Sequence, residues 1–536
     1  MFSESFTGRA LCQIKNAVLS SMAFHYITVI LNFVALLFKW VEYSAIYHFI
    51  FKIVKYFADK TKSSITYQLL QNTTKIDIYV KHSKILKFFD KISVSCLSGL
   101  EKIYKNIRKI NLGSINNTVF EYFHRSGYFR YELLVGYAFL ITFVVPHDFW
   151  NNIYGLGIAV ILFALYVVVL LSGRNFSYRI SELNIGLLIF MFMTAVSVFI
   201  SYAPRDSFRV FLFFITAYIF MFVISGSIKE ENTLHKFLGL VYLTVQITAV
   251  ICIIQGIIGV EADAVLTDMT TNEGLPGRAF STLENPNNYA EFLVMFFPFC
   301  WAFSLNIDNK GKRKAALCGL ALPVIAIALT YSRSGWVSIA LGVLTLIIFY
   351  DIKYLPYLIM AGIAAIPFLP QSIMQRLLTL GSMEDTSNAY RVYIWNGTID
   401  MMKDFWLRGI GMGTKTFQKL YPLYSDYWSK LAPHSHMLFL QVLAETGIIG
   451  VVAFLWFWVD FIKKSVTIYI KNKVSPKMKN VIIAGIASLI GLIFISGVEY
   501  IWFYPRNLTA FFCVIGIMSA SIRICKYTPE KKKGKL

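Results

Sequence analysis

The chain has 536 residues, of which 57% are hydrophobic and 15% are charged. An average soluble domain carries about 25% charged residues, so this composition excludes a soluble globular protein. Aromatic residues make up 16% of the chain, which suits a helical bundle that faces lipid. The formal net charge is +21. Because no nucleic-acid-binding motif accompanies that charge, we expect no nucleic-acid partner and assign it to the cytoplasmic side of a membrane protein.

The N-terminal region is basic, with 18 Lys and Arg against 7 Asp and Glu in residues 1–130. Residues 17–38 lack charged side chains, but their polar residues recur at helical spacing and favour a helix lying in the membrane plane. A thirteenth membrane span there is the alternative. The following segment, 52–110, is rich in lysine and amphipathic. We therefore predict a cytoplasmic or membrane-surface extension over residues 1–127.

Beyond this extension, twelve apolar segments approach the length that crosses about 30 Å of hydrocarbon. Their approximate limits are 131–146, 150–172, 181–203, 207–228, 234–259, 285–306, 314–331, 334–350, 353–370, 434–462, 480–498 and 505–524. Since the backbone cannot bond to water inside a membrane, each span must be helical. The sequence thus predicts an all-α, polytopic membrane domain of about 12 helices over residues 128–525.

Orientation follows from the distribution of Lys and Arg between alternate loops. One set of loops contains 15 of these residues and the other set contains 5. The positive-inside rule places the richer set in the cytoplasm. An even number of spans then places both termini there, including the basic tail 526–536. A long loop, 370–433, falls on the outer side, where loops of such length are usually functional.

Three arginines lie at outer ends of the predicted helices, where a charge usually faces a cavity. Arg278 precedes the segment ENPNN, in which Asn285 and Asn287 stand at a helix entrance that favours anions. Arg333 lies in a short hinge, and Arg391 lies in the long loop. The alternatives are a capping turn for Arg278, an interfacial anchor for Arg333, and a surface helix with a cation–π contact for Arg391.

Two histidines open the span 434–462, in the segment PHSHMLFLQVLAETGIIG. A histidine at a helix start is often only a cap, but neutral imidazole can also take a proton from a sugar hydroxyl. We regard His434 and His436 as candidate bases. Glu445 either orients a catalytic partner or forms a hydrogen bond within the bundle, and we leave both readings open. The glycine-rich segment GIGMGT at 409–414 is interpreted as a turn.

Three arginines and a histidine on one side describe an anion clamp with a base. Guanidinium groups bind phosphate in a bidentate manner, and a polyprenyl pyrophosphate carries two adjacent phosphates. Neither a DxD motif nor a cysteine-bearing cluster is present on the outer side, and the seven cysteines show no CxxC spacing. The sequence therefore predicts no metal site and no cofactor.

Five segments, in order, resemble motifs of the O-antigen ligase and O-antigen polymerase family. They are GRAFSTLENPNNYAEFL, TYSRSGW, RVYIW, RGIGMGTKTF and HSHMLFLQVLAETGIIG. The resemblance covers residues 130–520 and implies a glycosyltransferase C-type fold without a metal. It implies a donor glycan on undecaprenyl pyrophosphate and a glycan, lipid or protein acceptor. It assigns pyrophosphate binding to Arg278, Arg333 and Arg391, and catalysis to His436 with His434 beside it.

The resemblance implies an enzyme of surface polysaccharide assembly in the bacterial plasma membrane, acting either as polymerase or as ligase. The alternative is a transporter of lipid-linked glycans with the same basic cavity. A transporter requires charge along a path through both leaflets, and the inner halves of spans three to twelve carry almost none. This observation favours the enzyme.

Overall fold

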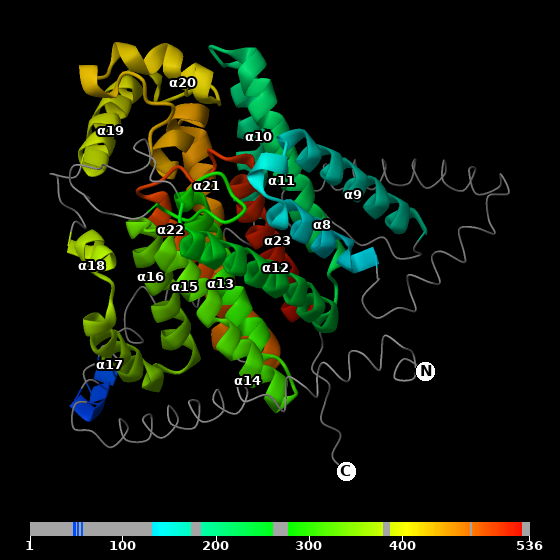
Figure 1. The fold of residues 1–536 in the computed structure, drawn as a ribbon. Helices are drawn as coiled ribbons and strands as arrows, with labels where there is room; N and C mark the ends of the chain where they lie inside the picture. The colour runs from blue at the N-terminus through cyan, green and yellow to red at the C-terminus, as the bar shows by residue number, and fades with distance from the viewer. Residues whose placement is uncertain are drawn as a thin grey trace. The chain divides into compact units, whose positions relative to one another are not determined.

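The computed structural model describes residues 47–49, 51–52, 55–56, 131–172, 184–260, 277–378, 386–471 and 474–527. Among these residues every regular element is a helix, which confirms the predicted all-α class (Figure 1). The helix predicted over 17–38 lies outside the described residues. Most of the lysine-rich segment 52–110 and of the basic tail 526–536 also lies outside them.

Eight helices in the described residues are long and apolar enough to cross a membrane. They are α9 (Asn152–Ser172), α11 (Pro204–Ser227), α12 (Glu231–Ile258), α13 (Pro286–Leu305), α16 (Arg333–Tyr350), α21 (Leu438–Lys471), α22 (Pro476–Ser496) and α23 (Pro505–Tyr527). Each coincides with a predicted span. The chain is therefore a polytopic membrane protein.

The other four predicted spans are also helical, but they are shorter. They correspond to α8 (Leu134–Val144), α10 (Ile185–Phe199), the consecutive helices α14 (Lys310–Gly319) and α15 (Ala321–Leu329), and α17 (Leu355–Ala365) between the 3₁₀ turns η4 (Ile352–Tyr354) and η5 (Ile366–Phe368). A straight span needs about 20 residues. The total of twelve spans and their orientation remain predictions.

The described residues form two compact units. The smaller unit combines the described part of the N-terminal region with residues 347–369. Within it, the Tyr47 hydroxyl donates to the carbonyl of Lys353 at 3.1 Å, and the Tyr47 ring lies 5.0 Å from that of Tyr357. The boundary predicted at residue 127 remains a prediction. All further description concerns the larger unit.

The larger unit is a bundle in which α11 packs along α23, α13 along α22 and α10 along α21. Its interior is rich in aromatic rings that contact one another, such as those of Phe139, Phe292 and Phe296. These rings fill the space between helices with large apolar surfaces. The bundle therefore supplies rigid helix ends on which polar side chains can be placed.

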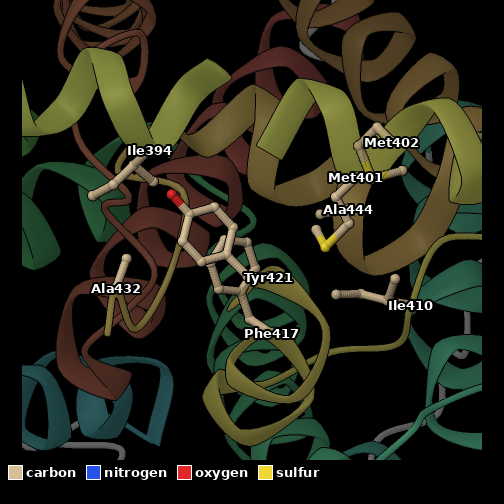
Figure 2. Close-up of a cluster of buried hydrophobic side chains, with 8 residues drawn as sticks. All are labelled: Ile394, Met401, Met402, Ile410, Phe417, Tyr421, Ala432 and Ala444. Carbon is tan, nitrogen blue, oxygen red and sulfur yellow. The ribbon is translucent and has the colours of Figure 1, made fainter. Parts of the chain in front are cut away.

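The predicted outer loop is largely helical. It contains α18 (Gln371–Leu378), α19 (Thr386–Phe405), α20 (Thr414–Leu420) and the 3₁₀ turns η6 (Tyr421–Leu423) and η7 (Tyr427–Ser429). Figure 2 shows its hydrophobic core, where Ile394 and Met401 of α19 face Phe417, Tyr421 and the α21 residue Ala444. The Phe417 and Tyr421 rings are stacked with centroids 4.8 Å apart. This core fixes α19 against the first turns of α21.

A break in α21 joins the segment 370–433 to the bundle. Gly447 has a φ of +67° and interrupts the helix, which frees backbone groups on both sides. The freed carbonyl of Ala444 accepts from the N–H of Ile410 at 2.7 Å, and the N–H of Ile448 donates to the carbonyl of Trp406 at 2.8 Å. Irregular backbone at membrane depth is tolerated where protein groups satisfy it in this way.

Gly447→Ala tests this junction. A Cβ atom on Gly447 would lie 2.4 Å from the carbonyl oxygen of Leu407, in a conformation that L-residues rarely adopt. We expect the change to lower the free energy of unfolding in detergent by at least about 1–3 kcal/mol. Gly157→Ala is the matched control, because a Cβ atom there has nothing within 4 Å. Equal stability of the two variants would contradict the account of the junction.

Candidate functional site

The entrance to α13 brings together two of the predicted residues. The Asn285 side chain caps the helix by accepting from the N–H of Asn287 at 2.8 Å, with Pro286 in the first turn. The Asn287 side chain is thereby turned toward Arg278, whose Nη2 donates to Asn287 Oδ1 at 2.5 Å. Arg278 is buried and also donates from Nε to the carbonyl of Thr330 at 2.9 Å. This arginine is held by the turn before α13 and by the end of α15.

A carboxylate that the sequence analysis did not select lies at the centre of the site. Glu499, between α22 and α23, is 7% exposed. Its Oε1 is 2.5 Å from Nη2 of Arg391, 3.4 Å from Nδ2 of Asn287 and 3.5 Å from the hydroxyl of Ser334. These donors come from α19, α13 and α16. Glu499 therefore connects three elements that are far apart in the sequence.

Arg391 projects from α19 into this arrangement. Its Nη1 donates to the Ser387 hydroxyl at 3.1 Å, one helical turn earlier, while Nη2 forms the ion pair with Glu499. The Nε atom of Arg391 is buried and has no partner among the described residues. Arg391 makes no cation–π contact with Trp395 in that part of the chain. One donor of this guanidinium therefore remains available for a ligand.

The structure adds a fourth arginine to the three that were predicted. Arg376 of α18 is buried, and its Nε donates to the carbonyl of Tyr331 at 3.4 Å. Burial of Arg278, followed by the positive charges of Arg376, Arg391 and Arg333, lowers the pKa of Arg278 to about 9, while Glu499 opposes this shift. Arg376, Arg391 and Arg333 therefore all lie close enough to Arg278 for their charges to act on it. We call Arg278, Arg333, Arg376 and Arg391, with Glu499, the arginine cluster.

The histidine pair stands beside the arginine cluster. His436 has a φ of +51°, an uncommon conformation for a residue other than glycine, and its N–H donates to Nδ1 of His434 at 3.1 Å. The two ring centroids are 4.2 Å apart. Because His434 Nδ1 accepts this bond, the proton of neutral His434 is assigned to Nε2. The turn thereby fixes the orientation of both imidazoles.

Both histidines are kept neutral. Burial, and then the positive charge of Arg391, lowers the pKa of His436 to about 3. Burial, then His436 and Arg391, holds the pKa of His434 well below its ordinary value. The Nδ1 atom of His436 is buried and has no hydrogen-bond partner among the described residues. Nδ1 of His436 can therefore form a hydrogen bond with a bound molecule, whereas the low pKa makes this imidazole a weak base as long as Arg391 and burial act on it.

Glu445 lies in a different environment. Its Oε1 accepts from the N–H of Gly413 at 3.3 Å, from Gln441 Nε2 at 2.9 Å and from the Tyr500 hydroxyl at 3.3 Å. The carboxylate therefore ties the glycine-rich turn to α21. It approaches the histidines only through Tyr500, whose ring centroid is 5.3 Å from that of His434. This geometry agrees with the structural reading of Glu445.

The structure thus brings Arg278, Arg391 and Asn287 together around one carboxylate, with Asn285 as the cap. Sequence reasoning missed Glu499 and Arg376. Glu499 is the only acidic residue between the spans 480–498 and 505–524, on the side to which the arginines were assigned. Buried arginines need a counter-ion, and this requirement points to Glu499. Arg376 lies in a helix within the long loop, and the neighbouring residues do not indicate that it is buried.

The fold and this geometry define a polytopic membrane protein with a cluster of buried arginines and two histidines beside it. A family model described as O-antigen ligase matches residues 318–455. The matched region contains Arg333, Arg376 and Arg391 and both histidines. This part of the chain is therefore similar to the O-antigen ligase family. No curated protein sequence matches the chain significantly.

A double-mutant cycle tests the central ion pair. The side chains of Arg391 and Glu499, taken without the backbone, are 18% and 9% exposed, so removing one partner leaves a largely buried charge. We expect Glu499→Gln to cost about 3–5 kcal/mol of stability, measured as the free energy of unfolding in mixed micelles. When Glu499→Gln and Arg391→Gln are combined, the loss of stability should differ from the sum of the two single losses by about 0.5–3 kcal/mol.

The control for this cycle is Asp400→Asn, which breaks the exposed pair of Asp400 with Lys403 on the same helix, α19. Exposed pairs contribute little to stability, so this variant should unfold like the wild type. Strictly additive effects of Arg391→Gln and Glu499→Gln would show that the two side chains do not interact.

Proposed function

We propose that the protein transfers a glycan from an undecaprenyl-pyrophosphate-linked donor to a hydroxyl of an acceptor on the outer face of the bacterial plasma membrane. The family implies a lipid-linked glycan donor in general terms. The observation that carries the specific proposal is the position of Arg391, which joins the other arginines near Arg278 and keeps a buried Nε without a hydrogen-bond partner among the described residues. A buried donor of this kind gains a partner when an anionic ligand binds.

A pyrophosphate suits this site better than a single small anion does. Arginine forks bind phosphate oxygens in pairs, and the arginines here come from four different segments of the chain. Glu499 occupies two of the donor groups that a phosphate would use, Arg391 Nη2 and Asn287 Nδ2. Bound pyrophosphate would compete with Glu499 for these groups. Positive charge then stabilises the leaving group in the role that a metal ion plays elsewhere.

The proposed reaction assigns a role to His436. An acceptor hydroxyl attacks the anomeric carbon of the donor sugar while His436 takes its proton. The bond from that carbon to the pyrophosphate oxygen breaks, and polyprenyl pyrophosphate leaves with its electron pair. Arg391 is one cause of the low pKa of His436. A bound pyrophosphate would offset that charge and raise the basicity of the imidazole when the donor is present.

The remaining predictions belong to the same proposal. The basic loops and tails lie in the cytoplasm, as the positive-inside rule predicts, and the arginine cluster then faces outward. The acceptor is a second lipid-linked glycan for a polymerase, and a lipid, wall polymer or protein for a ligase. Arg333, at the first turn of α16, completes the phosphate site beside Ser334.

Transfer by the purified protein in liposomes tests this proposal. A polyprenyl-pyrophosphate glycan should be consumed, and the acceptor should gain the glycan, at a rate that EDTA does not change. Arg391→Lys should lose at least about 100-fold in rate, because an ammonium group cannot reproduce the guanidinium fork. The matched control is Arg408→Lys, an exposed arginine just beyond α19 that contacts Tyr202. Activity that disappears in EDTA and returns with Mg²⁺ would contradict the metal-independent mechanism.

A further inference from the structure

Trp395 lies one helical turn beyond Arg391 on α19. Residues four apart in a helix share a face, and they are separated by a rise of about 6 Å along the axis. Ser387, Arg391 and Trp395 therefore form one row along α19. Arg391 already turns toward the centre of the arginine cluster. Trp395 is consequently the next side chain along the row that carries the proposed pyrophosphate ligand.

The indole of Trp395 has unused binding capacity. Its Nε1 is buried and has no hydrogen-bond partner among the described residues. Burying an N–H without a partner costs about 1–3 kcal/mol, so such a group calls for an explanation. Trp336 shows the ordinary arrangement, in which the indole N–H donates to the carbonyl of Ile327 at 2.8 Å.

Two other tryptophans share the unpartnered N–H but differ in their surroundings. Trp458 and Trp502 both lie within a cluster of phenylalanine rings in the bundle, with centroids 5.1–5.8 Å from their nearest neighbours. Contacts with these rings explain why the Trp458 and Trp502 side chains are buried. Trp395 makes neither a ring–ring nor a cation–π contact within the described part of the chain. The half-buried Trp395 side chain therefore has neither a hydrogen-bond partner for its N–H nor an aromatic neighbour among the described residues.

We propose that Trp395 binds the first sugar of the donor, the one attached to pyrophosphate. This inference rests on the proposed function, since the position of the sugar follows from that of the phosphates at Arg391. The indole N–H donates to a sugar oxygen, and the ring packs against the pyranose. The rise of one helical turn is similar to the distance between a phosphate group and the sugar that is bonded to it. Trp395 is thus a positioning residue that holds the anomeric carbon near His436.

Binding to two kinds of synthetic lipid, without and with a sugar, tests this inference with the full-length protein in nanodiscs. One probe is a short polyprenyl pyrophosphate, and the others are the same lipid carrying one of several single hexoses or N-acetylhexosamines. The wild type should bind at least one sugar-bearing lipid more tightly than the sugar-free lipid. Trp395→Phe should weaken binding of that lipid about tenfold and leave the sugar-free lipid unchanged, because only the N–H is lost. Trp395→Ala should weaken it further.

The matched control is Trp406→Phe, since Trp406 lies just beyond α19 and is 52% exposed. This variant should bind both kinds of lipid like the wild type. Equal losses for the two lipids in Trp395→Phe would show a structural role, and no loss for either would also overturn the inference. Failure of the wild type to bind the sugar-free lipid would instead contradict the proposed pyrophosphate site.

Discussion

Burial of positive charge at one end of the bundle is the constraint on which the rest of the site depends. A guanidinium group removed from water needs anions or carbonyl oxygens around it. Here the carbonyl of Thr330 and the side chain of Asn287 hold Arg278, while Glu499 holds Arg391. Burial and the charges of Arg376, Arg391 and Arg333 lower the pKa of Arg278, while Glu499 opposes the shift. The fold therefore gathers guanidinium groups from four segments of the chain in one place.

This electrostatic arrangement requires the segment 370–433 to be held in a fixed position against the bundle. Arg391 belongs to α19, whereas Glu499 lies between α22 and α23, 108 residues further along the chain. The break at Gly447 provides the register, because the Trp406 and Ile410 backbone groups replace missing helical bonds in α21. Glu445 adds a second attachment through Gly413. The break at Gly447 and the glycine-rich turn at Gly413 thus position α19 and its Arg391 side chain.

The sequence predicts the helices of the bundle and part of the site for different physical reasons. Long apolar segments must be helical in a membrane, so eight long helices coincide with predicted spans. Arg278 and Arg391 were predicted because charge is rare near apolar helix ends. Glu499 was not, since its significance depends on a partner far away in the sequence. The break in α21 was not predicted either, because one glycine in an apolar run does not reveal a φ of +67°.

A structure of the protein with bound polyprenyl pyrophosphate, in lipid nanodiscs, tests the central claim most directly. The account predicts that both phosphates lie among Arg278, Arg333, Arg376 and Arg391, with His436 facing the free end of the pyrophosphate. It also predicts that Glu499 no longer pairs with Arg391, because phosphate oxygens take its place. Phosphates bound away from these four arginines, with the Arg391–Glu499 pair intact, would contradict the account.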